Sequence, residues 1–141
     1  MTRYQAYQGH QIEGAGPLGL ILLSYEALYK SLARARLAIE AGDLAAEADH
    51  TGRSMEAIIE LSSSLNMTDG AEVAENLSSL YMYMMNRLTE GLCSCSTQHV
   101  DEVMHLVQEL REGWLALNAN QQKQGRSVPR EAAAQQIRAA A

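Results

Sequence analysis

The sequence contains no phenylalanine, and it has only two prolines and two cysteines among its 141 residues. Few prolines leave long stretches free to form helices, whereas strands favour aromatic and β-branched residues. Alanine, leucine, glutamate, glutamine and methionine, which the chain uses often, are good helix formers. The composition therefore predicts an all-α protein, and the length predicts a single domain with a sizeable core.

The two cysteines, Cys93 and Cys95, are separated by a single serine in a turn-like segment. A disulfide between them would be strained, and a reducing compartment would keep both as thiols. Redox chemistry is therefore not expected.

The chain also lacks an excess of positive charge and a long hydrophobic run. Its formal charge is −6, and its 11 basic residues are scattered. Nucleic acid and anionic membrane surfaces attract clustered lysine and arginine, so neither is expected as a partner. The longest apolar stretch, residues 18–23, is too short to span a bilayer, and the first residues lack the apolar run of a signal peptide. We expect a cytoplasmic protein.

Hydrophobic periodicity and turn signals predict four amphipathic helices with short connections. The expected helices cover residues 17–41 and 44–63, a third stretch after the loop at 66–70 that ends near residue 91, and a fourth from a cap at Ser96 or Thr97 to about residue 118. Gly42 and Asp43 suit a C-terminal cap followed at once by an N-terminal cap, which is typical of a tight connection between antiparallel helices.

The predicted fold is an antiparallel up-down four-helix bundle over residues 17–118. Residues 1–16 are polar and dotted with glycine, which indicates a flexible N-terminal arm. Residues 119–141 are polar and low in large apolar side chains, which indicates a mobile or partly helical tail, with Pro129 suited to the first turn of a short helix.

Each predicted helix carries one apolar stripe that should face the bundle core. The stripes comprise Leu18, Ile21, Leu22, Tyr25, Leu28, Tyr29, Leu32 and Ile39; Leu44, Ala48, Met55, Ile58 and Ile59; Val73, Leu77, Leu80, Tyr81, Met84 and Leu88; and Val100, Val103, Met104, Val107, Leu110, Trp114 and Leu117.

Two Glu-x-x-His pairs, Glu47 to His50 and Glu102 to His105, have the spacing used by di-iron carboxylate bundles. Ligands of such a centre project into the core, but Glu102 and both histidines lie off the apolar stripes, so a solvated face is the preferred interpretation. 

Cys93, Cys95 and His99 are likewise a weak zinc pattern, because no fourth ligand is evident. The sequence contains no nucleophile elbow and no phosphate-binding loop. We expect neither an enzyme nor a cofactor or metal site.

Several apolar residues lie outside the stripes and are the candidate binding residues. They are Leu20 and Leu23 in the first helix, Leu61 and Leu65 at the end of the second, and Met82 and Tyr83 in the third. Together they suggest a groove for an apolar segment of another chain, which Tyr4, Tyr7 and Ile12 of the arm could cover when it is empty. For Leu61 and Leu65, closing the end of the bundle is the preferred interpretation, and a contact with the partner is the alternative. Met82 and Tyr83 have the alternative of packing over a neighbouring helix.

Four motifs follow one another along most of the chain. The most specific, LDMxxGGEIAxNLxxLYDYMxRRL, is matched between residues 65 and 88. Before it, residues 7–28 are similar to the pattern YxxxxI…SPxxLIxxLYDGAL, and Glu40-Ala41-Gly42-Asp43 is similar to an EEGD connection. After it, residues 106–114 are similar to LLxELREAW. In this order the motifs resemble the flagellar secretion chaperone FliS family. The chain departs from the pattern at Gly16 in place of serine, Ala71 in place of glycine and Met82 in place of aspartate, whereas Tyr83 is shared.

The resemblance implies a non-enzymatic export chaperone that binds the disordered C-terminal segment of flagellin about one to one in the cytosol. Such a protein prevents premature polymerisation and keeps the subunit competent for the flagellar type III export apparatus. It can also contact the export gate, and weak self-association is expected of a free protein with an uncovered groove. The alternative is a helical adaptor that binds an export-gate component or a regulator without carrying flagellin.

Overall fold

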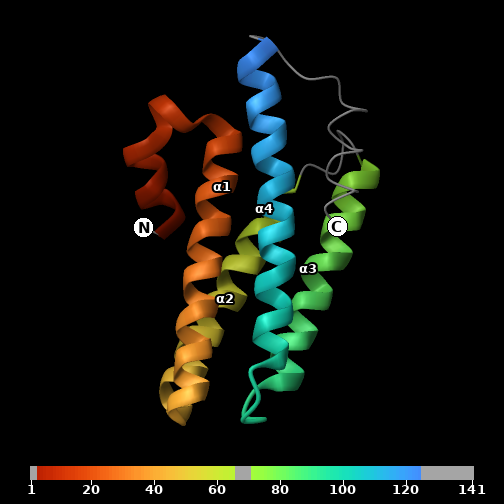
Figure 1. Cartoon of the computed structure of the whole chain (residues 1–141). Coiled ribbons are helices and arrows are strands. Elements are labelled where there is room, and N and C mark those ends of the chain that lie inside the picture. Colours follow the sequence, from red (N-terminus) through yellow and green to blue (C-terminus); the bar gives the residue numbers. More distant parts are fainter. Residues whose placement is uncertain (1–2, 66–70, 125–141) are drawn as a thin grey trace.

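The computed structural model describes residues 3–65 and 71–124, with side chains described for residues 18–65, 72–117, 119 and 120. It contains the helices α1 (Arg3–Ala41), α2 (Leu44–Ser63), α3 (Ala71–Gly91) and α4 (Gln98–Gln124) (Figure 1). Within these described residues the structure is all helical, which confirms the predicted fold class.

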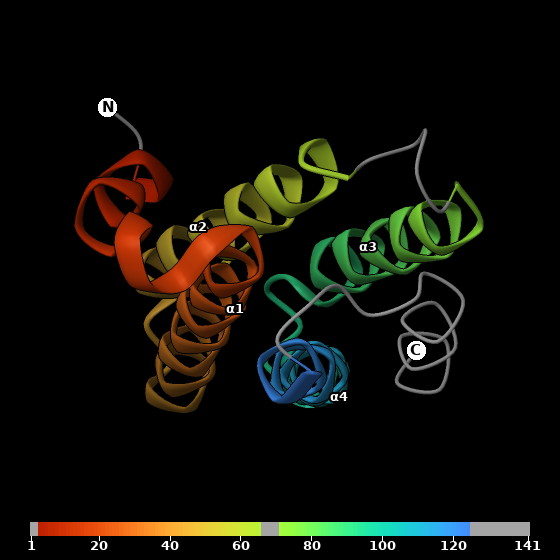
Figure 2. The same cartoon turned by 90° about the horizontal axis from the view of Figure 1, so that it is seen from above.

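The helices form a ring in which consecutive helices are neighbours and α4 returns to α1. Viewed along the bundle, α1, α2, α3 and α4 occupy successive corners (Figure 2), and extensive packing joins α1 to both α2 and α4. Neighbouring helices run in opposite directions, so the predicted up-down topology is confirmed. α2 and α3 pack less extensively against each other than α1 and α2 do.

The boundaries of α2 agree with the prediction, whereas α1 and α4 are longer than expected. α1 begins at Arg3, ahead of the predicted start at residue 17, and α4 continues to Gln124 through the first residues of the predicted tail. The division into arm, bundle and tail stays a prediction, because side chains 1–17 and residues 125–141 lie outside the described part of the chain.

The connection between α1 and α2 is the tight turn that the sequence predicts. Gly42 has φ 70°, a left-handed conformation that glycine adopts at little cost. The N–H groups of Gly42 and Asp43 donate to the carbonyls of Ile39 and Ala38, at 3.1 and 2.9 Å. The Asp43 carboxylate then accepts from the Ala46 N–H at 3.0 Å and caps α2.

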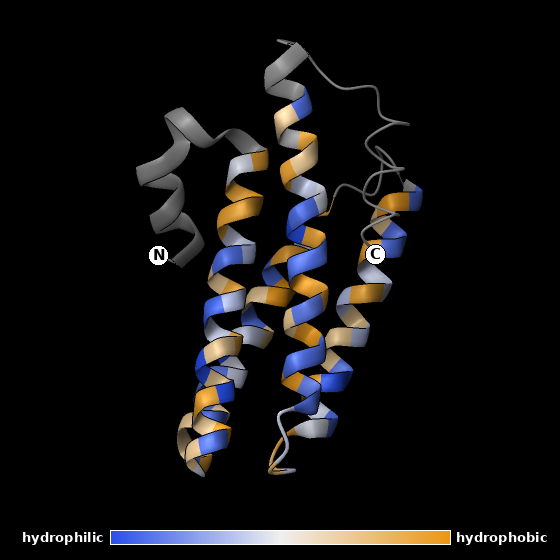
Figure 3. Ribbon diagram, in the orientation of Figure 1, coloured by the Kyte–Doolittle hydropathy of each residue, from blue (hydrophilic) through white to orange (hydrophobic). Residues whose placement is uncertain are grey.

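The core is a continuous apolar cluster with contributions from all four helices. Colouring by hydropathy shows apolar positions recurring along each helix among polar ones (Figure 3). Most residues of the predicted stripes of α1, α3 and α4 belong to this cluster or pack against it, whereas Leu18 and Leu22 of α1 are half-buried outside it. The fully buried members include Tyr25, Leu28, Leu32, Leu77, Met84, Leu88, Val100, Val103 and Val107.

The predicted stripe of α2 is wrong in part. Leu44 and Ile59 are each 55% exposed, and Ala48 is also exposed. The buried face of α2 instead consists of Glu47, Thr51, Ser54, Ile58 and Leu61. Ser54 Oγ donates to the His50 carbonyl at 2.9 Å, which satisfies one polar group of this face. Thr51 Oγ1, in contrast, is buried without a hydrogen-bond partner among the described residues.

The connection between α3 and α4 packs against the beginning of α2. Cys93 and Cys95 both have positive φ, 63° and 62°, and their thiols are free and exposed. The Cys93 N–H donates to the buried Glu47 carboxylate at 3.1 Å. His99 is also buried here, and its ring lies so close to Gly91 that a Cβ at residue 91 would overlap it.

We predict that Gly91→Ala lowers the free energy of unfolding by about 1–3 kcal/mol, because the new methyl group must displace a buried ring. Gly52→Ala is the matched control within α2, where a Cβ meets no atom within 4 Å. It should raise the free energy of unfolding by about 1 kcal/mol through helix propensity alone. Urea denaturation followed by circular dichroism measures both, and equal effects would contradict this packing.

We also predict a pH dependence that involves His99. Burial lowers the pKa of His99, and Arg87 adds to the shift, while Glu47 and Asp101 oppose it. Because the unfolded chain then binds a proton more readily, the contribution of His99 to stability is complete above the unfolded pKa of about 6.5 and is lost as the pH falls below it.

Thermal unfolding between pH 7.5 and pH 5.5 tests this prediction on the native chain and on His99→Gln. The native chain should lose more stability over this interval than the variant does, with one proton limiting the slope to about 1.4 kcal/mol per pH unit. Parallel curves would show that His99 is not responsible.

Candidate partner-binding surfaces

Two of the candidate binding residues belong to the core. Leu20 is 7% exposed and Leu61 is 4% exposed. On a helical projection Leu20 shares a flank of α1 with Ser31 and Ala35, the flank that faces α2, so α1 buries a wider arc than its main stripe. The expectation that Leu20 faces outward is wrong, whereas the burial of Leu61 agrees with its preferred interpretation, closure of the bundle end.

Leu23 and Leu65 are half-buried. Leu65 packs against the core cluster at the end of α2, in agreement with its preferred interpretation. Tyr4, Tyr7 and Ile12 lie outside the residues whose side chains the structure describes, so their role as a covering arm stays a prediction.

Met82 and Tyr83 are the most exposed of the candidate residues in the described part of the chain, at 62% and 44%. They follow each other on α3, and successive residues of a helix point about 100° apart. Their side chains therefore lie on opposite flanks of the helix, with Tyr83 towards α4 and Met82 on the side of α2.

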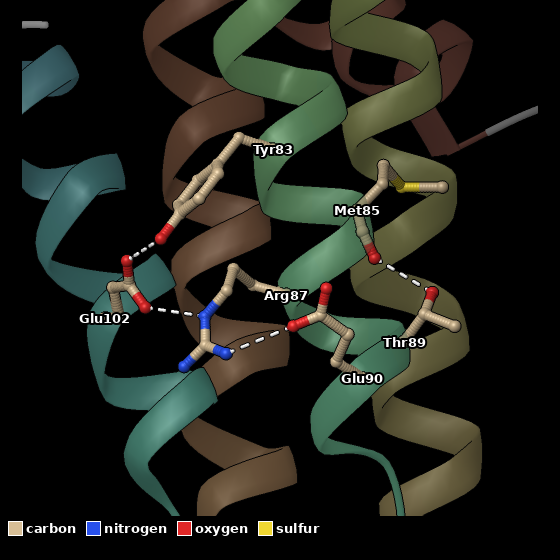
Figure 4. A network of polar contacts seen from close by, with 6 residues as sticks. All are labelled: Tyr83, Met85, Arg87, Thr89, Glu90 and Glu102. Atoms are coloured by element: carbon tan, nitrogen blue, oxygen red, sulfur yellow. Dashed lines mark hydrogen bonds and ion pairs between the residues drawn. The ribbon is translucent and has the colours of Figure 1, made fainter.

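The Tyr83 hydroxyl is held by a polar network between α3 and α4 (Figure 4). It donates a hydrogen bond to the Glu102 carboxylate, which also accepts from Arg87 Nε at 2.7 Å. Arg87 Nη1 reaches Glu90 at 3.3 Å. The hydrogen bond from Tyr83 and that from Arg87 lower the pKa of Glu102, while the same contact raises the pKa of Tyr83. The network fixes one edge of the ring and leaves its face accessible.

Met82 belongs to a second apolar surface, formed by the flanks of α2 and α3 that face each other. On α3, Met85 points to the side opposite Tyr83 and Arg87, towards α2 (Figure 4), and Met82 lies on the outer part of the same flank. On α2, Met55 and Ile59 occupy the flank towards α3. We call Met55, Ile59, Met82 and Met85 the α2–α3 surface; its outer members are exposed, and Met55 and Met85 are half-buried against the core.

Ile59 was predicted to lie in the core stripe of α2, so it was not among the candidate surface residues. Thr51, Ser54 and Ile58 follow the heptad-like spacing of a buried face, but the two polar residues among them concealed it. Around the helix axis, Leu44, Met55 and Ile59 are centred to one side of the face formed by Thr51, Ser54 and Ile58. This displacement was the signal that could have identified the buried face.

A hydrogen-bonded group of aromatic residues ties α1, α3 and α4 together inside the bundle. The hydroxyls of Tyr25 and Tyr81 share a hydrogen bond, and Trp114 Nε1 donates to the Tyr25 hydroxyl at 3.1 Å. Burial raises the pKa of both tyrosines, so both stay neutral at physiological pH. The Tyr25 oxygen is the shared member of both contacts.

Ion pairs join α4 to its two neighbours. Arg36 Nε contacts Asp101 at 2.6 Å and Arg111 Nη2 contacts Glu26 at 2.9 Å, both between α1 and α4. The pair of Arg87 with Glu102 joins α3 to α4. These exposed pairs contribute little energy each, but they cover the two seams beside α4 with polar groups.

The residues of the two Glu-x-x-His pairs do not converge. Glu47 is buried against the α3–α4 connection, Glu102 is engaged by Tyr83 and Arg87, and His105 pairs with Glu109 at 2.9 Å on the surface. In the part of the chain that the structure describes, no three histidine, cysteine, aspartate or glutamate residues are grouped to hold a metal ion. None of the described helices is both long and apolar enough to cross a membrane.

Comparison with known proteins gives a consistent result. The family model described as "Flagellar protein FliS" matches residues 1–122. The flagellar secretion chaperone FliS of Salmonella typhimurium is 33% identical over 104 residues, which cover 73% of this chain and 77% of that protein. The protein of the same name from Campylobacter jejuni is 30% identical over 118 residues, 84% of this chain and 92% of the relative. That of Vibrio cholerae is 27% identical over 104 residues, 74% and 76% of the two chains.

We predict that Tyr25→Phe destabilises the bundle more than Tyr81→Phe does. Removing the Tyr25 hydroxyl leaves both Tyr81 and Trp114 without their partner, at a cost of about 1–3 kcal/mol, whereas Tyr81→Phe removes one bond of about 1 kcal/mol. The double variant should cost less than the sum of the two singles, because the shared bond is lost only once. Equal single effects that add in the double variant, measured by urea denaturation, would contradict the shared role of Tyr25.

Proposed function

The chain belongs to the FliS family of flagellar proteins, and on that premise we propose that it binds the C-terminal segment of flagellin in the cytoplasm, about one to one. It keeps the subunit from polymerising there and delivers it to the flagellar type III export apparatus, without catalysis. Membership of this family of flagellar export chaperones is the observation that carries the proposal.

The exposed apolar residues support a role in binding an apolar segment. Met82 and Tyr83 stand out on α3, and Ile59 extends the apolar area onto α2. Apolar patches bounded by polar residues are common at protein interaction sites, and flexible methionine side chains adapt to the shape of a partner. Tyrosine adds a large rigid contact area, which suits a residue at the centre of an interface.

A partner that folds on binding suits an export cycle. Ordering a disordered segment consumes part of the interaction energy, so a large interface gives moderate affinity and the subunit can be released. We expect a dissociation constant between about 1 μM and 1 nM, which corresponds to about −8 to −12 kcal/mol.

Isothermal titration calorimetry with flagellin and with flagellin that lacks its C-terminal segment tests the proposal. Full-length flagellin should bind with a stoichiometry of about one, and the truncated form should not bind. Undiminished binding of the truncated form contradicts the mechanism. If neither form binds, while a flagellar regulator or an export-gate component does, the adaptor function replaces the chaperone.

We predict that Tyr83→Ala weakens flagellin binding at least about tenfold, or about 1.4 kcal/mol, because the ring presents an accessible apolar face to the partner. The melting temperature should change little, since Tyr83 lies outside the core cluster. Calorimetry and thermal unfolding measure the two effects on the same samples.

Two control variants separate the contributions. Tyr83→Phe removes only the hydroxyl that contacts Glu102, so it should bind nearly as well as the native chain if the ring makes the contact. Leu37→Ala removes an apolar side chain of α1 that is 65% exposed, and binding should be unchanged. A large fall in melting temperature for Tyr83→Ala would assign the residue a structural role instead.

A further inference from the structure

The α2–α3 surface exposes large apolar side chains to solvent. Ile59 is 55% exposed and Met82 is 62% exposed, and the half-buried Met55 and Met85 continue the surface inwards to the core. The seams beside α4, in contrast, are covered by the ion pairs described above. The α2–α3 surface is therefore a place where a further apolar segment can pack.

Residues 125–141 have the composition of a segment that can pack there. If they form a helix after Pro129, Ala133, Ile137 and Ala140 fall on one side, while Glu131, Gln135 and Arg138 fall on the other. Small alanine side chains allow a helix to approach a surface closely, and Ile137 is the one large apolar residue of this stripe.

The segment and the part of the chain that contains α2 and α3 carry net charges of opposite sign. Residues 125–141 contain three arginines and one glutamate, a net charge of +2. Residues 44–91, which include α2 and α3, contain eight acidic residues and two arginines, a net charge of −6. Opposite charges of this size attract a tethered segment over about 8–10 Å at physiological ionic strength.

The segment is long enough to reach the surface from the end of α4. Helix axes in a bundle are about 8–10 Å apart, so the diagonal from α4 to α2 is about 11–14 Å. A helix rises about 17 Å from Ala71 to Met82. The path across the end and down to Met82 is therefore about 28–31 Å. Ile137 follows Gln124 by 13 residues. If residues 125–132 are extended they span about 26 Å, and a helix from Ala133 to Ile137 adds about 6 Å, so Ile137 can reach Met82. Because α3 begins at the end of the bundle where α4 finishes (Figure 1), the path runs over that end.

We propose that residues 125–141 fold back over the end of the bundle and dock as a short helix on the α2–α3 surface, with Ile137 against Ile59 and Met82. The free chain thereby covers its own apolar surface, and the small side chains keep the contact weak enough for a partner to displace it. This inference goes beyond the proposed function, since it concerns the free chain and holds whether or not flagellin is the cargo.

Paramagnetic relaxation in the full-length protein tests the contact. Cys93→Ser and Cys95→Ser remove the two exposed thiols, and Gln135→Cys then places a nitroxide label on the polar side of the segment, where it leaves Ile137 intact. The amide signals of Ile59 and Met82 should lose intensity, and those of Arg36 and Leu37 on α1 should not. Uniform loss, no loss, or loss confined to another face overturns the proposal.

Two further samples separate the explanations. Charge reversal by Arg130→Glu with Arg138→Glu should restore the signals of Ile59 and Met82, whereas Lys30→Glu on the exposed part of α1 should not. Restoration by the control alone, or by neither variant, contradicts the electrostatic docking. In a mixed sample, one copy of the chain is isotope-labelled and has no nitroxide, and the other copy is unlabelled and carries the nitroxide. The signals of Ile59 and Met82 should keep their intensity in this mixture. A loss of intensity would assign the contact to a second copy and overturn the intramolecular proposal.

Discussion

The packing of α1 against two neighbours is the constraint on which the rest of the bundle depends. On the side of α2, α1 presents Ser31, Ala35 and Ala38, all buried, and small side chains let the two helices approach closely. The facing side of α2 must then be compact as well, and it buries Thr51 and Ser54 instead of the larger Leu44 and Ile59. When this compact face of α2 is turned towards α1 and the core, Leu44 and Ile59 are left exposed. The packing that buries Thr51 and Ser54 therefore also places Ile59 on the apolar surface beside α3.

Several polar groups inside the bundle lie where a partner satisfies them, whereas Thr51 Oγ1 and His99 Nε2 have no hydrogen-bond partner among the described residues. The Tyr25 hydroxyl joins Tyr81 and Trp114, and Glu47 accepts from the backbone of the α3–α4 connection. Such contacts contribute modest net energy, but an unpaired buried group costs about 1–3 kcal/mol, so they select one arrangement of the helices over others. In this way the orientation of α3, and therefore of the residues it exposes, is defined by contacts in the interior.

Much of this structure could be predicted from the sequence because its signals are local or strongly periodic. The Gly42-Asp43 turn and the stripes of α3 and α4 were correct, since cap chemistry and a single apolar face leave few alternatives. The prediction of the buried face of α2 was wrong because it was based on large apolar residues. Close contact with α1 favours small side chains on that face, and such a pattern does not detect them. Leu20 was misplaced for the related reason that a helix with two close neighbours buries more than one stripe. The resemblance to the family came from motif order, and no periodicity argument could have supplied it.

The neighbouring residues Met82 and Tyr83 show how one helix serves two surfaces. Because they lie about 100° apart, Tyr83 is directed to α4, where its hydroxyl donates to Glu102, which Arg87 also contacts. Met82 is directed to the seam with α2, on the flank that it shares with Met85. Tyr83 presents a rigid ring, whereas Met82 presents a flexible thioether on a surface that also contains Met55 and Met85. A segment that contacted both would have to cross the outer face of α3, whereas a short tail docked beside α2 would cover Met82 and leave Tyr83 open. A partner that displaces such a tail would therefore bind first at Tyr83, before any contact on the α2–α3 surface is broken.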